Sequence, residues 1–353
     1  MSIRRTILIL FLALIAYLLF WPVDIQPMAW TPPEPPVPEG VWAPNDYLNQ
    51  LSIHGLNCQG CEDIAVDSLG RVYGGTKDGY LLRFTAGQCD TLIHTGGRPL
   101  GMAWDSLERL VIADAKLGVV RYTPSSGDLN VLTDNYQGQP FGLADDLDVA
   151  PDGCIYFSDA SDRWAVEDLR VDFMEHGANG ALYRYDPSTQ VTDLLVDNGY
   201  FTNGVAVSLD GSYLLYNETS VYRVMKYHLK GPRSGQTEVL IEGLPGFPDG
   251  ISAAADGSYW LTLIYPRQKT LDFSLPRPWL RRLFRRIPKF LLPKPAHQNR
   301  VLQINAEGEV LRSLQDSSPS YHSISSVEQF DQQLFLGTLE DQGFGIFPLG
   351  EKK

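Results

Sequence analysis

The sequence predicts an all-β fold, a six-bladed β-propeller, with an N-terminal transmembrane anchor and a basic amphipathic helical insert. The main observation is a short phrase that returns along the chain. In each copy, apolar residues two positions apart are followed by a turn signal and a second apolar run, the pattern of a β-hairpin. The copies begin at Glu62, Leu100, Asp145, Asn203, Asp249 and, with a shift of one residue, His322 or Ser323. A repeated hairpin unit is typical of closed folds in which each unit covers the apolar face of its neighbour.

Length and composition agree with one large domain. The chain has 353 residues, of which 44% are hydrophobic, enough to bury a sizeable core. Because the repeats continue almost to the end of the chain, we expect a single propeller at residues 56–350, with the insert at about residues 265–298. A pair of β-sandwiches is the alternative, which the near-constant spacing inside the phrases disfavours. The net charge of −13 argues against nucleic acid as a partner, because phosphate binding needs a basic surface.

The first element, residues 1–23, is predicted to be a signal anchor that crosses a membrane as a single helix. Its apolar run extends from Ile7 to Trp21, close to the lower limit for a membrane span. A cleaved signal peptide has the same flanks, but no small-x-small cleavage motif follows this run, so we favour an uncleaved anchor. Arg4 and Arg5 predict a cytoplasmic N-terminus, which places the propeller in the periplasm or on the outer or lumenal side of a membrane.

A proline-rich linker, residues 24–55, is predicted next. Five prolines lie between Pro32 and Pro38, a composition that gives a stiff, extended spacer and would lift the propeller off the membrane. Cys58 and Cys61 follow as an isolated C-x-x-C motif. A zinc ribbon needs a second pair, and a redox motif is expected in a βαβ unit. A structural disulfide is permitted outside the cytoplasm, but the sequence leaves the pairing of the four cysteines open.

The insert interrupts the strand pattern between the fifth and sixth repeats. Residues 273–306 contain several arginines and lysines and no acidic residue. Within them, residues 278–291 have the pattern of an amphipathic helix, with Trp279 and other apolar residues on one face and arginines on the other. This pattern is typical of a helix that lies in a membrane interface. It equally fits a helix packed across the rim of the propeller, and both interpretations stay open.

The leading positions of four repeats carry oxygen-donating side chains. In a propeller the innermost strand of each blade lines the central channel, so equivalent positions face one axis. Glu62, Asp145, Asn203 and Asp249 should therefore converge there. Carboxylate and amide oxygens, with no cysteine or histidine among them, favour Ca²⁺ over zinc. The simpler interpretation, that these are turn residues at strand ends, does not suit Glu62. The sequence therefore predicts a calcium site.

Several phrases of the chain, taken together, are specific for one family. They include Ala144-Asp-Asp-Leu-Asp-Val, Thr202-Asn-Gly-Val-Ala-Val-Ser and Pro248-Asp-Gly-Ile. On the basis of these phrases, nearly the whole chain resembles the strictosidine synthase-like branch of the gluconolactonase and paraoxonase superfamily. The resemblance implies a six-bladed propeller with a catalytic calcium at the channel mouth. It also implies that Glu62, Asn203 and Asp249 occupy the family's ligand positions.

Three positions depart from the pattern that the resemblance implies. Asp145 stands where relatives usually have Asn, so three carboxylates would face the ion. Leu100 stands where paraoxonase-like enzymes place a catalytic His, so their His-based activation of water does not carry over. The stretch beginning at Tyr321 lacks the Glu that strictosidine synthases use near the end of the chain. We therefore do not expect condensation of the strictosidine synthase type.

These features predict a membrane-anchored, calcium-dependent hydrolase of esters or lactones, of the arylesterase or lactonase type. Asp249 is the predicted general base or nucleophile, and His322 is a second catalytic candidate. No Gly-x-Ser-x-Gly motif occurs, which disfavours a serine hydrolase. A small lipophilic ester or lactone is the expected substrate, since the basic helix would form one wall of the entrance beside the bilayer. The alternative is a non-catalytic, calcium-stabilised propeller that binds a ligand or partner. Asn217 matches an N-glycosylation acceptor.

Overall fold

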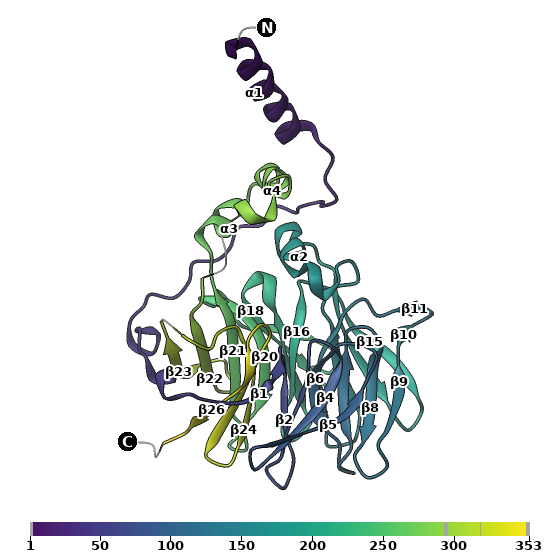
Figure 1. Cartoon of the computed structure of the whole chain (residues 1–353). Coiled ribbons are helices and arrows are strands. Elements are labelled where there is room, and N and C mark those ends of the chain that lie inside the picture. Colours follow the sequence, from purple (N-terminus) through teal and green to yellow (C-terminus); the bar gives the residue numbers. More distant parts are fainter. Residues whose placement is uncertain (1–2, 293–295, 318, 351–353) are drawn as a thin grey trace.

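The computed structural model describes residues 3–292, 296–317 and 319–350 and confirms the six-bladed β-propeller (Figure 1). Each blade is a four-stranded antiparallel sheet, and five blades consist of consecutive strands. The first two are β2 (Ile64–Val66), β3 (Val72–Gly75), β4 (Tyr80–Thr85) and β5 (Gln88–His94), then β6 (Pro99–Trp104), β7 (Leu110–Asp114), β8 (Gly118–Thr123) and β9 (Asp128–Thr133).

The next three blades repeat this arrangement after a small hairpin of β10 (Asn135–Tyr136) and β11 (Gln139–Pro140). The third blade contains β12 (Ala144–Val149), β13 (Ile155–Asp159), β14 (Gly180–Asp186) and β15 (Val191–Gly199). The fourth contains β16 (Thr202–Val207), β17 (Tyr213–Glu218), β18 (Arg223–His228) and β19 (Thr237–Ile241). The fifth contains β20 (Gly246–Ala253), β21 (Tyr259–Pro266), β22 (Asn299–Ile304) and β23 (Val310–Asp316). The first strand of each blade lines the channel.

The sixth blade joins the two ends of the propeller. Its inner strands are β24 (Ile324–Phe330), β25 (Gln333–Thr338) and β26 (Gln342–Pro348), and its outermost strand is β1 (Ser52–Gln59). β1 pairs antiparallel with β26, with Ser52 opposite Ile346. The sheets therefore begin at Ser52, inside the segment 24–55 that was predicted as linker. A disulfide between Cys58 and Cys61 ties the end of β1 to the segment that enters the first blade.

The hydrophobic core lies between neighbouring blades. One cluster joins the fourth and fifth blades through Leu215, Tyr222, Leu261 and Leu302, all nearly inaccessible to solvent. Equivalent clusters lie between the other pairs of blades. Each sheet is therefore buried on both sides, which explains why the inner strands read as short apolar runs. The blades hold one another in place, and the channel between them is positioned by all six.

Three helices cover one face of the propeller, here called the helical face (Figure 1). α2 (Leu169–Glu175) connects β13 to β14, and α3 (Lys269–Ser274) and α4 (Pro278–Arg285) connect β21 to β22. In an antiparallel blade the connection from the second strand to the third lies at the end where the first strand begins. The inner strands therefore begin at the helical face. Short 3₁₀ turns accompany these connections: η3 (Val166–Asp168), η4 (Thr219–Val221) and η5 (Lys289–Leu291).

The N-terminal helix α1 (Ile3–Phe20) projects from the same face (Figure 1). Among the described residues it is the one helix long and apolar enough to cross a membrane, and it buries none of its side chains in the protein. Tyr17 Oη donates to the carbonyl oxygen of Arg286 at 2.9 Å, and Asp24 pairs with Arg285 at 2.6 Å. The end of the candidate anchor thus contacts the insert.

The proline-rich segment lies along the propeller rather than forming a free spacer. Ile25 is buried, the Trp30 ring stacks on His176 with 4.7 Å between ring centroids, and the Trp30 amide donates to Leu275 O at 3.2 Å. Two 3₁₀ turns, η1 (Gly40–Trp42) and η2 (Tyr47–Gln50), then lead along β23 into β1. Apolar residues between the prolines give this segment a surface to bury, which the prediction of a spacer overlooked.

The insert forms a shorter helix than predicted. α4 ends at Arg285, and Pro288 separates it from η5, so residues 278–291 do not form one continuous helix. Arg281, assigned by the sequence pattern to the polar face, is completely buried. Its guanidinium donates to carbonyl oxygens of Met28, Met174, Glu175 and Leu275. This arginine joins the linker segment, α2, α3 and α4, and the need to satisfy those carbonyls explains its burial.

Candidate functional site

The inner strands bring the four predicted ligands together where the channel meets the helical face. Glu62 lies just before β2, and the others lie in the first half of β12, β16 and β20. Asp145, Asn203 and Asp249 are each less than a tenth exposed, and Glu62 is partly buried. Burial first, and then the carboxylates of Asp249 and Asp145, raise the pKa of Glu62 well above its usual value. These side chains therefore act on one another electrostatically.

Asp249 is the most firmly held of the four. Its Oδ1 accepts a hydrogen bond from Asn203 Nδ2 at 2.5 Å, which leaves the amide oxygen of Asn203 as the atom available to a cation. Its backbone carbonyl accepts from Asn217 Nδ2, and the preceding carbonyl of Pro248 accepts from Thr219 Oγ1 at 2.7 Å. Burial and the Asp145 carboxylate raise the pKa of Asp249 well above its usual value. β17 and η4 thus fix the backbone that carries this carboxylate.

Asn217 supports the site and cannot accept a glycan. Its side chain is fully buried and bonds to the Asp249 carbonyl, so the glycosylation prediction is wrong. Gly204 allows this contact, because a Cβ there would lie 2.2 Å from the Asp249 carbonyl oxygen and 2.7 Å from Asn217 Nδ2. The second position of the repeated phrase is thus glycine where two inner strands approach closely. This glycine could have indicated the close approach from the sequence.

A buried arginine, missed by the sequence reasoning, interacts electrostatically with two of these carboxylates, Glu62 and Asp145. Arg98 is 4% exposed, and its Nη1 donates to Gly60 O at 3.0 Å. Burial lowers its pKa, whereas the charges of Glu62, Asp114 and Asp145 act in the opposite direction. Its position two residues before Leu100, where a repeat begins, could have indicated from the sequence that Arg98 lies near the channel. Arg98 offsets part of the negative charge on the blade-one and blade-three side of the channel.

The donor set fits a hard divalent cation. Three carboxylates and one amide oxygen converge, and the one positive charge of Arg98 offsets only part of their charge. Glu62, Asp145 and Asp249 do not bring one oxygen each within 4.8 Å of one another. Repulsion between like charges favours wide spacing while no cation lies between them, and oxygen ligands of Ca²⁺ lie 2.3–2.6 Å from the ion. The residues present therefore suit Ca²⁺.

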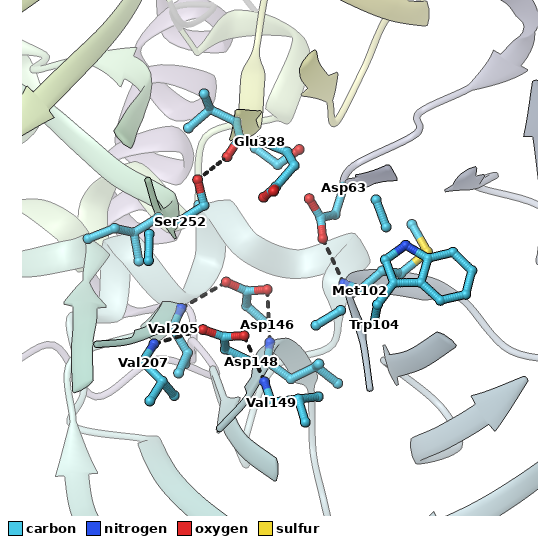
Figure 2. Close-up of a pocket in the computed structure, with 18 of the residues that line it drawn as sticks. Asp63, Met102, Trp104, Asp146, Asp148, Val149, Val205, Val207, Ser252 and Glu328 are labelled. Atoms are coloured by element: carbon cyan, nitrogen blue, oxygen red, sulfur yellow. Dashed lines mark hydrogen bonds between the residues drawn. The ribbon is translucent and has the colours of Figure 1, made fainter. Parts of the chain in front are cut away.

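Below the predicted ligands the channel forms a cavity of about 350 Å³. Figure 2 shows four further acidic side chains around it, Asp63, Asp146, Asp148 and Glu328. Burial raises the pKa of Asp63 and Asp148 to about 6, and burial with the charges of Asp63 and Asp148 raises that of Glu328 to about 8. The channel is strongly acidic along its length. Asp146 and Asp148, two positions apart on one strand, were the sequence signal for this lining.

Three of these carboxylates also join neighbouring blades (Figure 2). Each accepts a hydrogen bond from a backbone amide on the inner strand of the next blade. The pairs are Asp63 with Met102 at 2.6 Å, Asp146 with Val205 at 2.8 Å and Asp148 with Val207 at 2.8 Å. Asp63, Asp146 and Asp148 therefore help to hold neighbouring blades together, whether or not they also bind a ligand.

His322 lies to one side of the predicted ligands. Its ring stacks on His297 with 3.9 Å between ring centroids, and its backbone amide donates to Asp341 Oδ2 at 2.6 Å. Among the described contacts, none joins His322 to Asp249. Leu100 is buried with Leu143 in an apolar cluster, so the position at which paraoxonase-like enzymes place a catalytic histidine is part of the core here.

Comparison with known proteins agrees with this architecture. The family profile for strictosidine synthase matches residues 145–232, and that for the strictosidine synthase-like N-terminal region matches residues 40–84. The adipocyte plasma membrane-associated protein of Danio rerio is 31% identical over 340 residues, covering 89% of this chain and 81% of that protein.

Solved structures of gluconolactonase-type propellers have the same fold. A gluconolactonase of Xanthomonas campestris superposes with a TM-score of 0.62 at 18% identity, over 84% of this chain and 89% of its own. Regucalcin of Agrobacterium tumefaciens, described as a calcium-binding protein, superposes with a TM-score of 0.59 at 15% identity, over 84% and 92%. With the sequence match over most of the Danio rerio relative, these findings show that the chain belongs to the strictosidine synthase-like family of six-bladed propellers.

Proposed function

We propose that this protein is a membrane-anchored, calcium-dependent hydrolase of esters or lactones. The observation that carries the proposal is the convergence of Glu62, Asp145, Asn203 and Asp249 at one end of the channel. Buried carboxylates are costly unless a cation or hydrogen bonds compensate them. Solved gluconolactonase and regucalcin structures share the fold, which supports the assignment without fixing the reaction.

Calcium would be held by the carboxylates of Glu62, Asp145 and Asp249 and by the amide oxygen of Asn203. A bound Ca²⁺ would polarise the carbonyl group of the substrate and stabilise the negative charge that develops on its oxygen. The protein's own contribution is to orient these donors: Asn203 restrains the Asp249 carboxylate, and Asn217 restrains the backbone behind it.

Asp249 is the proposed general base. Its carboxylate is fixed in direction by the hydrogen bond from Asn203, and a bound cation would keep it ionised and able to accept a proton. A water molecule or hydroxyl group within hydrogen-bond reach of its free oxygen would lose a proton to it. His322 receives no step in this scheme because it contacts His297 and Asp341 instead.

The membrane is the second part of the proposal. α1 would cross the bilayer with Arg4 and Arg5 on the cytoplasmic side, leaving the propeller on the other side. The Cys58–Cys61 disulfide suits an oxidising compartment. α1 and the insert lie on the face at which the channel residues converge (Figure 1), so the substrate would enter next to the lipid surface. That location favours small lipophilic esters or lactones.

Asp249→Asn tests the function most directly. This change keeps an oxygen ligand and removes the charge and the basicity. We expect the full-length protein, solubilised in detergent, to retain calcium while its turnover of aryl esters or lactones falls at least about a hundredfold. Calcium content by elemental analysis and initial rates on a substrate panel give the two readouts. Equal rates in the variant and the wild type would move the role of base to another residue.

A non-catalytic calcium-stabilised propeller is the second candidate. The observation in its favour is Leu100, which is buried in an apolar cluster and provides no histidine beside the site. Wild-type protein that holds calcium but turns over no ester or lactone in the panel would support this candidate. Binding of a ligand or partner in the channel would then be the activity to measure.

A further inference from the structure

We propose that His297, His322 and Glu340 form a separate site for a transition metal ion, with Zn²⁺ as the expected occupant. One ligand atom from each residue lies within 4.8 Å of the others. Ligands of a tetrahedral zinc, about 2.0–2.1 Å from the ion, lie about 3.3 Å apart. Small rotations of three side chains on the protein surface would close that difference.

The three residues come from separate segments that meet at the helical face. His297 precedes β22 in the fifth blade, while His322 precedes β24 and Glu340 follows β25 in the sixth. By the strand directions of a blade, all three positions lie at the end where the inner strands begin. The stacked imidazole rings, 27° from coplanar, bring His297 against His322 across the boundary between blades. A metal here would tie the insert that precedes β22 to the last blade.

Neighbouring groups can orient these ligands. His322 Nδ1 lies 3.2 Å from Ser323 Oγ and 3.5 Å from Asp341 Oδ2, and Asp341 Oδ2 also accepts a hydrogen bond from the His322 backbone amide. A carboxylate behind one ring nitrogen commonly directs the other nitrogen of a histidine to a metal. Ser323 Oγ donates to Glu340 Oε2 at 3.0 Å, which restrains the third ligand. The cluster therefore has the supporting contacts that a bare group of surface charges lacks.

The donor types separate this site from the proposed calcium site. Two imidazole nitrogens and one carboxylate favour Zn²⁺ and related transition metals, whereas all-oxygen donors favour Ca²⁺. Three protein ligands also leave one coordination position open, as in zinc sites that bind water or an exogenous ligand. Ser323 connects the two regions, since its hydroxyl lies 3.4 Å from Tyr265 Oη, and the charge of Asp249 contributes to the raised pKa of Tyr265.

The test is a zinc titration of the full-length protein in detergent after removal of bound metals. Competition with a chromophoric chelator should show that the wild type binds one zinc ion. His297→Ala and His322→Ala should each bind it with at least a tenfold weaker affinity. His297 is exposed, so its replacement should leave the fold intact. His54→Ala is the matched control, because His54 is an exposed histidine on β1 whose ring interacts with Ser52 and Phe344 and is not part of the His297, His322 and Glu340 group.

Two further measurements make the outcome decisive. X-ray absorption at the zinc edge should show two imidazole ligands in the wild type and one in His297→Ala. Asp249→Asn should leave zinc affinity unchanged, so failure of the calcium proposal would not affect this result. Wild-type protein that binds no zinc, or a His297→Ala/His322→Ala double variant that binds it as tightly as wild type, would overturn the proposal.

Discussion

His176 is a single residue on which the attachment of the proline-rich segment depends. It is 1% exposed, adopts a left-handed conformation at the end of α2, and stacks on Trp30. Burial, with a smaller contribution from the charge of Arg281, lowers its pKa to about 3. Neither ring nitrogen has a hydrogen-bond partner in the described structure. The imidazole is therefore neutral in the folded protein at ordinary pH, and protonation requires its exposure.

The pH dependence of stability should reveal this histidine. The unfolded chain takes up a proton near pH 6.5 and the folded chain only near pH 3, so the contribution of His176 is present above pH 6.5 and declines as the pH falls between these values. At pH 4.5 the loss is roughly 2–3 kcal/mol. We expect His176→Phe to gain stability relative to wild type as the pH is lowered from 7 to 4.5, measured by chemical denaturation. A pH-independent difference between the two would contradict this account.

The repeat predicted the residues whose positions follow from strand periodicity. Glu62, Asp145, Asn203 and Asp249 occupy equivalent places, so counting along the phrase was sufficient to bring them together. The sequence did not predict Arg98 as a site residue because it lies in the connection before an inner strand, where no periodic pattern applies. It did not predict His297 beside His322 because the path of the insert, which brings the two together, cannot be deduced from the repeats. Contacts between segments with no shared pattern require the three-dimensional arrangement of the blades.

Among the elements, α4 shows how far an amphipathic pattern can be read. The pattern correctly placed a helix at Pro278, but burial of Arg281 and the break at Pro288 follow from contacts with α2 and the linker segment. The large apolar residues of the insert that remain more than half exposed, among those the structure describes, are Phe273, Trp279, Phe290 and Leu291. With the neighbouring arginines and the end of α1, they form a surface suited to a lipid bilayer, which we propose as its partner.

Removal of Trp279 and Phe290 should weaken membrane binding. A chain lacking residues 1–20 removes the apolar helix, together with the hydrogen bonds that Tyr17 and Leu18 make with Arg286, so that the remaining binding comes from the insert. We expect this shortened protein to sediment with anionic vesicles, and Trp279→Ser/Phe290→Ser to reduce the bound fraction at least about tenfold, the effect of losing roughly 1.5–3 kcal/mol per buried side chain. Leu107→Ser, an exposed leucine in the turn at the opposite face, is the control. Equal binding by both variants would exclude this surface.

At the scale of the whole molecule, six blades share one acidic channel. Buried and partly buried carboxylates from the first, third, fifth and sixth blades face it, and their pKa values rise because loss of hydration and mutual repulsion disfavour their charge. A cation at the proposed calcium site would therefore stabilise contacts between blades as well as any reaction. The fold class followed from the repeats, whereas this concentration of charge emerged only when all blades were assembled.

Chelation of calcium should lower the stability of the full-length protein. Binding to the folded state alone contributes about 4 kcal/mol when the free ion exceeds its Kd a thousandfold, and a thermal melt with and without chelator measures the loss. Glu62→Gln should remove most of the difference. Glu307→Gln changes an exposed carboxylate on the outer part of the fifth blade and should leave it intact. Unchanged melting of wild type in chelator would count against the site.

The pairing of β1 with β26 has a consequence for how the protein is made. β1 leaves the ribosome early, but its partner strand is completed about 300 residues later, which at usual rates of synthesis is about 15–60 s. During that interval β1 lacks its partner strand and has unpaired backbone groups. α1, which is made before β1, is by then already able to enter a membrane. The propeller can therefore be sealed only after translation has nearly finished, and under the proposed anchoring by α1 this happens with one end of the chain already tethered. A ribosome-stalled chain lacking β26 would have an exposed β1 edge, and would be a natural substrate for a chaperone.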